Sequence, residues 1–207
     1  IEVANAKPEA PWVGIGASGE WTDVQEAMAA ADLDFVVGSR TMEYQCNADE
    51  CGSIVTYNPV TGFKANVRED TDKFLGCVSG TYQIVQNEEV FSLLEPFIQA
   101  GGKITHAGMT DQGLCFMLAE VENASIAGDN YTINVMATNS FNGAFPAAVI
   151  CTPLRIICQN MYRSLMGQSD NVARYRHSLN ASQRLGAMKA AYDMFTSYNG
   201  KFSENVE

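Results

Sequence analysis

Histidine is scarce in this sequence, with only His106 and His177 among 207 residues. Neither histidine lies in a G-x-S-x-G or C-x-x-C context, so the spacing indicates no nucleophile–base pair. The D-x-D spacing of Asp70 and Asp72 falls in a turn signal, where aspartate is common for conformational reasons, and no E-x-x-H spacing or P-loop occurs. We therefore expect no catalytic residue, no metal site and no cofactor, in a protein that is not an enzyme.

Long apolar runs are missing as well. The longest ones fall far short of the roughly 20 residues that a membrane-spanning helix requires, so no membrane partner is expected. Hydrophobic residues nevertheless make up 46% of the chain, which is enough for one substantial core. No repeat, low-complexity segment or long linker divides the sequence. We predict a single α+β domain over residues 1–207.

The six cysteines form no recognisable framework. Four lie inside apolar strand or helix patterns, where a free thiol behaves as a small hydrophobic side chain. Cys46 and Cys51 instead flank the polar segment N-A-D-E, either as two loop thiols or as a local disulfide, and a zinc site there would need two further ligands. These features favour a reduced, cytoplasmic setting.

β-branched and aromatic residues cluster in short segments that are separated by Gly, Asp, Asn and Pro, a pattern typical of antiparallel strands joined by turns. An entry loop and a short helix are expected over residues 11–32, and strands over 33–152 with one helix inserted at 88–100. The expected strands are 35–37, 53–57, 63–68, 74–85, 103–107, 114–121, 131–138 and 145–151. Because the connections are too short for parallel crossovers, the sequence predicts an antiparallel meander packed against two or three helices.

Capping signals place the first two helices. Thr22 and Gln25 make a capping box for the short helix, and Asn87 is expected to cap the second one. Pro96 should kink or shorten that second helix, because proline lacks the N–H that the helix interior requires.

A third helix is predicted within the basic segment 153–199, where Thr152-Pro153 follows a buried strand and the turn signal Asn142-Gly143. Its apolar stripe comprises Leu154, Ile157, Cys158, Met161 and Leu165, and its other face carries Arg155, Gln159, Tyr162 and Arg163. A short strand at 172–178 and a last helix at about 182–198 complete the chain.

The charge of the chain is unevenly distributed. Residues 1–150 carry 20 Asp/Glu and 6 Lys/Arg, a net charge of −14, whereas residues 151–207 carry 4 and 7, a net charge of +3, and together these give −11. The total opposes a polyanionic partner, but a basic segment within an acidic chain is also a pointer to one. Scattered basic residues on solvated helix faces would produce the same counts.

We predict that these basic residues collect into one nucleic-acid-binding strip. Its members are Arg155, Gln159, Tyr162, Arg163, Arg174, Arg176, His177 and Arg184. Guanidinium groups suit phosphates because they donate in a bidentate fork. Tyr162 would either stack a base or pack on the sheet, and His177 would either contact phosphate or fill a core edge.

Several motifs resemble the phage/plasmid-like protein family, an uncharacterised domain of bacteriophages and mobile elements. They are P-W-V-G-I-G at 11–16, G-T-Y-Q-I-V-Q-N-E-E-V-F at 80–91, T-N-S-F-N-G at 138–143, T-P-L-R-I-I-C-Q-N at 152–160 and R-H-S-L-N at 176–180. The order of elements is also similar, at the level of the fold, to the core of phage single-strand annealing recombinases.

The resemblance implies a phage- or plasmid-encoded protein of the bacterial cytoplasm that binds single-stranded DNA and promotes annealing and recombination without a nucleotide cofactor. It also implies a homo-oligomer, either a ring or a filament. The alternative is a phage interaction or assembly protein that binds no nucleic acid and whose basic face docks an acidic partner.

Overall fold

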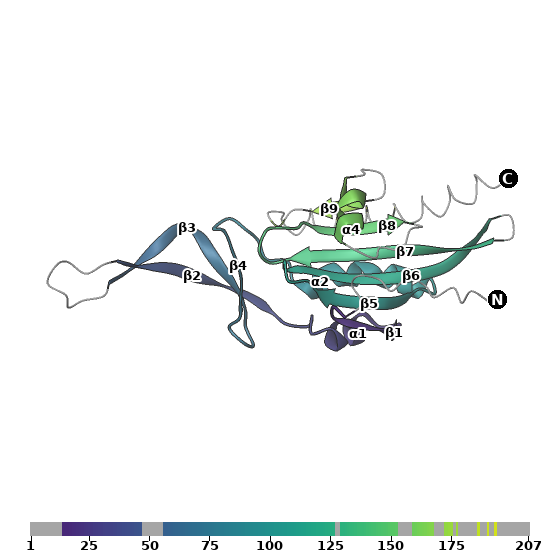
Figure 1. The fold of residues 1–207 in the computed structure, drawn as a ribbon, viewed down its shortest axis with the longest axis horizontal. Helices are drawn as coiled ribbons and strands as arrows, with labels where there is room; N and C mark the ends of the chain where they lie inside the picture. The colour runs from purple at the N-terminus through teal and green to yellow at the C-terminus, as the bar shows by residue number, and fades with distance from the viewer. Residues whose placement is uncertain are drawn as a thin grey trace, which may run out of the picture.

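The computed structural model describes residues 14–46, 56–126, 129–152, 159–167 and 172–175, together with the single residues 177, 186, 190 and 193. Its centre is a six-stranded antiparallel sheet in the order β1-β5-β6-β7-β8-β9 (Figure 1). These strands are β1 (Ala17–Trp21), β5 (Lys103–Met109), β6 (Leu114–Ile126), β7 (Asp129–Ser140), β8 (Ala147–Thr152) and β9 (Val172–Tyr175). The antiparallel α+β architecture predicted from the sequence is confirmed. Strand β1 was missed, because its residues were expected to form an entry loop, and pairing with β5 makes them a strand.

The core has two parts, one on each face of this central sheet, because successive side chains of a strand point to opposite faces. On β6, Cys115, Met117 and Ala119 belong to the larger cluster. Leu114, Phe116 and Leu118 alternate with them and belong to the smaller cluster. Both faces of the central strands are therefore buried, which explains why β6 reads as a continuous apolar run.

Helices cover both faces. The larger cluster packs beneath α1 (Val24–Ala30), α2 (Asn87–Phe91), the 3₁₀ turn η1 (Ser92–Leu94) and α3 (Glu95–Gln99). The smaller cluster packs beneath α4 (Gln159–Met166) on the opposite face. Antiparallel strands covered by the helices near Asn87 and after Thr152 were expected, and this arrangement is confirmed.

A second sheet projects from the central body as an arm in the order β2-β3-β4 (Figure 1). Its strands are β2 (Val37–Cys46), β3 (Thr56–Arg68) and β4 (Phe74–Ser79). The antiparallel meander predicted here is confirmed, but most of β2 was missed and the strand predicted at 74–85 ends at Ser79. The two strands predicted at 53–57 and 63–68 are wrong as separate elements, because β3 continues from Thr56 to Arg68 through the expected turns at Asn58-Pro59 and Thr61-Gly62. Residues 38–45 are exposed or only partly buried, so this strand has no buried face along most of its length. Its sequence is therefore mainly polar and lacks the alternation of apolar and polar residues that identifies a strand.

Arg68 joins the arm to the body. Its guanidinium donates to both carboxylate oxygens of Asp32, at 2.6 and 2.8 Å, and to both of Asp70, at 3.0 and 2.7 Å. The same group lies 4.2 Å from the centre of the Phe35 ring. Arg68 itself is only 8% exposed, and four hydrogen bonds to two carboxylates compensate the burial of its charge.

The helix boundaries differ from the predicted ones at two caps. The side chain of Asp23, rather than that of Thr22, accepts from the Glu26 N–H at 2.9 Å and caps α1. Gln86 precedes α2 as its N-cap, and Asn87 is a buried residue of the first turn. The second helix is broken into three short pieces, and Pro96 is the second residue of the last of them, α3, where its missing N–H costs no helical hydrogen bond.

The third predicted helix differs in its buried face. Thr152 is the last residue of β8, α4 begins at Gln159, and residues 153–158 lie outside the described part of the chain. Tyr162 was placed on the non-core face, but it is 2% exposed and belongs to the smaller cluster with Leu165. The prediction sorted the side chains of this helix by polarity. Burial depends instead on which side of α4 faces the sheet, and Tyr162 lies on that side.

Of the predicted last helix, the structure describes Gly186, Ala190 and Asp193, which are helical and exposed. Their spacing of four and three residues puts them on one helix face, as expected for the face opposite the apolar stripe. Among the helices within the described ranges, none is long and apolar enough to cross a membrane.

Candidate functional site

The segment T-N-S-F-N-G (138–143) ends β7 and leads toward β8, and it contacts several distant parts of the chain. Thr138 Oγ1 lies 3.5 Å from the Tyr162 hydroxyl of α4. Ser140 Oγ donates to the Phe145 carbonyl at 2.9 Å and accepts from the Phe145 N–H at 3.2 Å. The loop that follows β7 is therefore fixed at both ends by one hydroxyl.

Two buried amides connect β7 with α2 and with the segment after α1. Asn139 Nδ2 donates to the Val85 carbonyl at 3.0 Å and to Asn87 Oδ1 at 3.1 Å. Asn87 Nδ2 in turn donates to the Leu33 carbonyl at 3.0 Å. Both asparagines are at most 1% exposed, and these hydrogen bonds compensate the cost of burying both Nδ2 groups and Asn87 Oδ1. Asn139 Oδ1 is buried without a hydrogen-bond partner among the described residues.

The next two residues hold the base of the arm. The Phe141 ring lies 5.8 Å from the Phe35 ring, centre to centre, and the Phe141 carbonyl accepts from Asn66 Nδ2 at 2.7 Å. At Gly76 in β4, an added Cβ would lie only 2.4 Å from Asn142 Cβ. The arm thus approaches this loop so closely that only glycine fits at the contact.

The Asn142-Gly143 turn that the sequence predicts is confirmed. Gly143 has φ of +75°, a conformation that glycine adopts without steric cost. Asn142 Oδ1 accepts from the Ala144 N–H at 2.9 Å, and its Nδ2 donates to the Gln112 carbonyl at 2.8 Å. The turn therefore joins the loop to the connection between β5 and β6.

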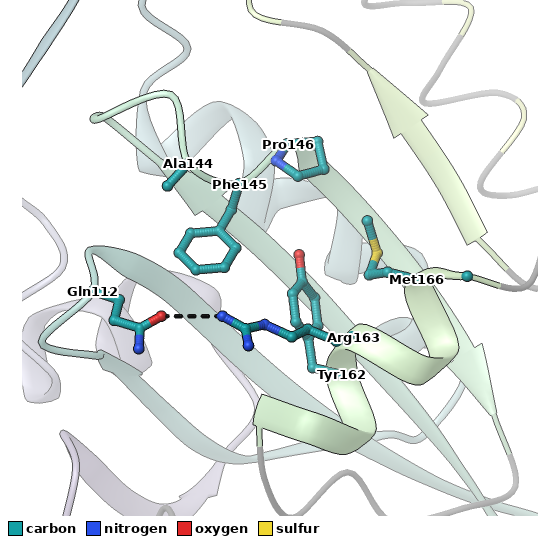
Figure 2. Close-up of a pocket in the computed structure, with 8 residues that line it drawn as sticks. Gln112, Ala144, Phe145, Pro146, Tyr162, Arg163 and Met166 are labelled. Carbon is teal, nitrogen blue, oxygen red and sulfur yellow. Dashed lines mark hydrogen bonds between the residues drawn. The ribbon is translucent and has the colours of Figure 1, made fainter.

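A first cavity of about 500 Å³ lies between this loop, the β5–β6 connection and α4. Figure 2 shows the Phe145 ring facing the Tyr162 ring, with Arg163 reaching toward Gln112. The two rings meet edge to face with 6.2 Å between their centres, and Arg163 Nη2 donates to Gln112 Oε1 at 3.4 Å. The other residues that line the cavity are Ala144, Pro146, Met166 and Gly167.

A second cavity of about 420 Å³ lies beside it and shares its wall at Ala144, Phe145 and Pro146. It is lined further by Ser79, Thr81, Tyr82, Gly143 and His177. The Tyr82 and His177 rings stack with 4.7 Å between their centres and 17° between their planes. The Tyr82 hydroxyl donates to the Ser140 carbonyl at 2.8 Å, which fixes this wall to the end of β7. We refer to the first and second cavities together as the paired cavities.

The lining of the paired cavities contains basic but no acidic side chains among the described residues. The chain as a whole nevertheless contains 24 acidic residues and only 13 basic ones. Arg163 is exposed at the first cavity. Arg174 is also exposed. It lies opposite Ala148 in the pairing of β8 with β9, two residues from Val172, which lies opposite Ile150. Because Ile150 and Val172 belong to the smaller cluster, Arg174 lies on the face of the sheet that carries α4.

Burial suppresses the ionisation of Tyr162 at this site and of two thiols on the opposite face of the central sheet. It raises the pKa of the Tyr162 hydroxyl, against smaller opposing effects of the Thr138 hydroxyl and the Arg174 charge. Burial also raises the pKa of the thiols of Cys115 and Cys151 to about 12, so neither offers a thiolate near neutral pH. Within the described residues, no group of three or more His, Cys, Asp or Glu side chains could hold a metal ion.

The structure brings several residues of the predicted strip together. Tyr162 and Arg163 line the first cavity, His177 lines the second, and Arg174 lies on the α4 face. Of the two roles left open for Tyr162, the structure shows packing on the sheet, and His177 is likewise buried at 8% exposure. Gln159 begins α4, but its side chain is not described, and Arg155, Arg176 and Arg184 lie outside the described residues.

Sequence reasoning missed three residues of the site, Gln112, Phe145 and Tyr82. Phe145 was assigned to the buried strand, whereas β8 begins at Ala147 and the ring of Phe145 is only partly buried. The Phe145-Pro146 pair directly after the Asn142-Gly143 turn was an available signal, because proline ends backbone pairing before a strand. Tyr82 and Gln112 carried no signal, since their place depends on contacts that are distant in sequence.

Comparison with known proteins gives a family for the chain. No curated protein and no solved structure matches the sequence. The sequence profile of the family described as "Domain of unknown function (DUF932)" matches residues 74–207, which include β4, the whole T-N-S-F-N-G segment and α4. The match covers well over half of the 207 residues. The chain therefore belongs to the DUF932 family.

Proposed function

We propose that this protein binds single-stranded DNA across the paired cavities and the α4 face, and that it promotes annealing in a phage or plasmid. The observation that carries the proposal is the combination of two exposed arginines, Arg163 and Arg174, with the partly exposed Phe145 ring on one face of the sheet. Arginine supplies phosphate contacts, and an aromatic ring supplies a stacking platform that accepts any base.

The dimensions and charge of the site support this proposal. Volumes of about 420 and 500 Å³ fall within the roughly 300–1,000 Å³ of small-molecule sites, so each cavity can hold a base or nucleoside. The lining lacks carboxylates in an acidic chain, and phosphate binding needs only a locally positive potential. Phe145 takes the stacking role in place of Tyr162, whose ring is buried.

The function needs no nucleotide cofactor. An annealing protein holds the phosphates of a strand and leaves the bases between its stacking contacts accessible to a complementary strand, so affinity comes largely from counterion release rather than from chemistry at a catalytic centre. The resemblance to the phage/plasmid-like family supports the phage or plasmid setting, and the similarity to annealing recombinases supports the strand-pairing step.

The test measures binding of fluorescein-labelled oligothymidine by anisotropy at several salt concentrations. The Arg163→Ala/Arg174→Ala double variant should bind more weakly for all base compositions, because phosphate contacts carry no sequence information. Losing two phosphate contacts should also reduce the slope of log K against log salt by about 1.4. Strand annealing, followed by fluorescence quenching of two complementary oligonucleotides, should slow in parallel.

The matched control is Lys73→Ala/Lys103→Ala, which removes the same charge from exposed positions that do not line either cavity. This control should keep the wild-type slope. Equal losses in both double variants, or no DNA binding by the wild type at low salt, would contradict the proposal. The second of these outcomes would favour the alternative of an interaction or assembly protein, for which the exposed aromatic residues of the arm are the supporting observation.

A further inference from the structure

The second cavity has a lining that suits a flat, uncharged ring. Aromatic side chains stand on two of its walls: Tyr82 and His177 stack with each other on one, and Phe145 belongs to the wall that is shared with the first cavity. Among the described residues that line it, none is Asp, Glu, Lys or Arg. Walls of this kind favour a planar ligand group that stacks on them and carries no charge of its own.

Both aromatic walls are fixed to Ser140 at the end of β7. The Tyr82 hydroxyl donates to the Ser140 carbonyl at 2.8 Å, and Ser140 Oγ bonds to the backbone of Phe145 at 2.9 and 3.2 Å. The Gln83 N–H also donates to the His177 carbonyl at 2.6 Å, which ties the segment after β9 to the chain beside Tyr82. The cavity is therefore formed before a ligand enters, and this lowers the entropic cost of binding.

Two hydroxyl groups supply hydrogen bonds to this cavity. Ser79 Oγ and Thr81 Oγ1 lie 2.9 Å apart, and Ser79 Oγ also accepts from the Thr81 N–H at 3.3 Å. One hydroxyl hydrogen serves the bond between the two oxygens, which leaves the other to donate to a ligand and leaves lone pairs to accept. The edges of nucleobases carry donors and acceptors side by side. Because hydroxyl groups rotate, this pair can meet such an edge with little preference among the bases.

A cation lies on the other side of the shared wall. Arg163 lines the first cavity, which is separated from the second one by Ala144, Phe145 and Pro146 (Figure 2). Its guanidinium donates to Gln112 Oε1 at 3.4 Å, a long hydrogen bond to a neutral group. Within the described ranges, the ion pairs do not include Arg163. A guanidinium held in this way is available to a phosphate group.

We propose that the paired cavities bind one nucleotide, with its base in the second cavity and its phosphate at Arg163. A nucleotide joins a flat, uncharged ring to an anion through a sugar, and the two cavities offer these two environments on either side of one wall. This inference rests on the proposed function and deepens it, because it assigns a base to one cavity and names Ser79, Thr81 and Tyr82 among its contacts. The same chemistry admits two sources, a nucleotide within a single strand and a free nucleoside monophosphate.

A base in the second cavity contacts both parts of the molecule. Ser79 is the last residue of β4 in the arm and Thr81 follows it, whereas Phe145 and Pro146 belong to the loop after β7 in the body. Binding should therefore hold the arm against this loop. One base of a bound strand is also withheld from a complementary strand until it leaves the cavity.

Saturation-transfer NMR of the full chain tests the assignment with thymidine monophosphate, thymidine and deoxyribose phosphate as probes. The methyl group of thymine should receive the strongest transfer. Thymidine monophosphate should bind roughly threefold more tightly than thymidine, because an exposed ion pair adds a modest free energy, and Arg163→Ala should remove this difference. Deoxyribose phosphate should bind most weakly, because it lacks the ring that stacks.

Thr81→Tyr adds a ring at the second cavity and leaves Phe145 and Arg163 in place. This variant should lose the transfer to thymine and bind oligothymidine roughly fivefold or more weakly, as expected for one lost base contact. The matched control, Thr22→Tyr, adds the same ring at an exposed position that lines neither cavity, and it should behave as the wild type. Ser79→Ala/Thr81→Val removes both hydroxyls without adding bulk and should weaken thymidine binding roughly threefold.

Addition of oligothymidine distinguishes the two sources. If it displaces thymidine monophosphate, the cavity takes a base of the strand. If the monophosphate binds and oligothymidine does not displace it, the ligand is the free nucleotide, so the proposed function fails and this site stands. The inference is overturned by a wild type without transfer to thymine, by deoxyribose phosphate that binds as tightly as the monophosphate, or by unchanged thymidine binding in both Thr81 variants. Oligothymidine binding that still depends on Arg163 and Arg174 would then leave the proposed function standing.

Discussion

The guanidinium of Arg68 faces two carboxylates and an aromatic ring at once. Hydrogen bonding from Arg68 lowers the pKa of Asp32 and of Asp70, and the same bonds raise the pKa of Arg68. A carboxyl whose pKa is lower in the folded state stabilises the fold above its unfolded-state pKa. That stabilisation is lost as the pH falls through the folded-state pKa.

We therefore predict that acid weakens the junction between arm and body. The free energy of unfolding of the wild type should fall as the pH decreases from about 5 to about 2, and the fall should be shallower in Arg68→Met, which keeps the aliphatic stem but not the charge. Urea denaturation at a series of pH values measures this difference. Arg40→Met is the matched control, because Arg40 is half exposed and meets Glu69 and Asp72 only at 4.0 and 3.6 Å. Parallel curves for Arg68→Met and the wild type would contradict the prediction.

At the residue scale, the sequence indicated which side chains matter for the structure better than it indicated the contacts that they make. Asn87 was recognised as a structural residue, but its amide holds the Leu33 carbonyl and Asn139 instead of capping a helix. Tyr162 was placed on the wrong face of its helix, because a helical pattern alone does not say which side the sheet will cover. Arg163 and Arg174 were placed correctly as exposed residues.

At the scale of elements, the close approach between β4 and the loop after β7 determines where the arm lies. Strands β5 to β8 could be predicted from their apolar runs and the turns between them, because burial on both faces leaves a strong signal. Strand β2 could not be predicted in full, because a strand exposed on both faces leaves none. The approach of Gly76 to Asn142 was also invisible in the sequence, since it joins residues 66 positions apart.

Gly76→Ala should loosen the arm. An added Cβ would lie 2.4 and 2.6 Å from Asn142 Cβ and Cα, so backbone must shift, and overpacking of this kind costs roughly 1–3 kcal/mol. The matched control is Gly80→Ala, whose Cβ would lie 3.5 Å from the nearest atoms of Gly62, an ordinary contact. Hydrogen exchange followed by mass spectrometry should show faster exchange of β4 in Gly76→Ala and unchanged exchange in Gly80→Ala. Equal exchange of β4 in both variants would show that the close approach does not hold the arm.

At the scale of the whole molecule, the body and the arm differ in how they are stabilised. The body contains both core clusters around the central sheet, whereas the outer part of the arm is a ribbon with exposed aromatic side chains. The charge asymmetry was visible in the sequence. The sequence did not show where the charges lie in space, because the arm, which has no net charge, is part of the first 150 residues, which are acidic as a whole.

Shortening the arm should leave the body folded. Thr41 pairs with Lys64, so replacing residues 42–63 by Asn-Gly leaves a hairpin with a two-residue turn. We expect this variant to unfold cooperatively on heating and to bind single-stranded DNA with the wild-type salt slope, because both core clusters and the paired cavities lie outside the removed residues. Loss of cooperative thermal unfolding would show instead that the outer arm is part of the folding unit.

The short loop after β7 has one further consequence. Phe141 holds the base of the arm and Phe145 lines the paired cavities, and Ser140 fixes the backbone between them. We therefore expect occupancy of the cavities and the position of the arm to be thermodynamically linked through a segment of five residues. Whatever factor a bound oligonucleotide contributes to the docking of the arm on this loop, a docked arm must contribute the same factor to the affinity for that oligonucleotide.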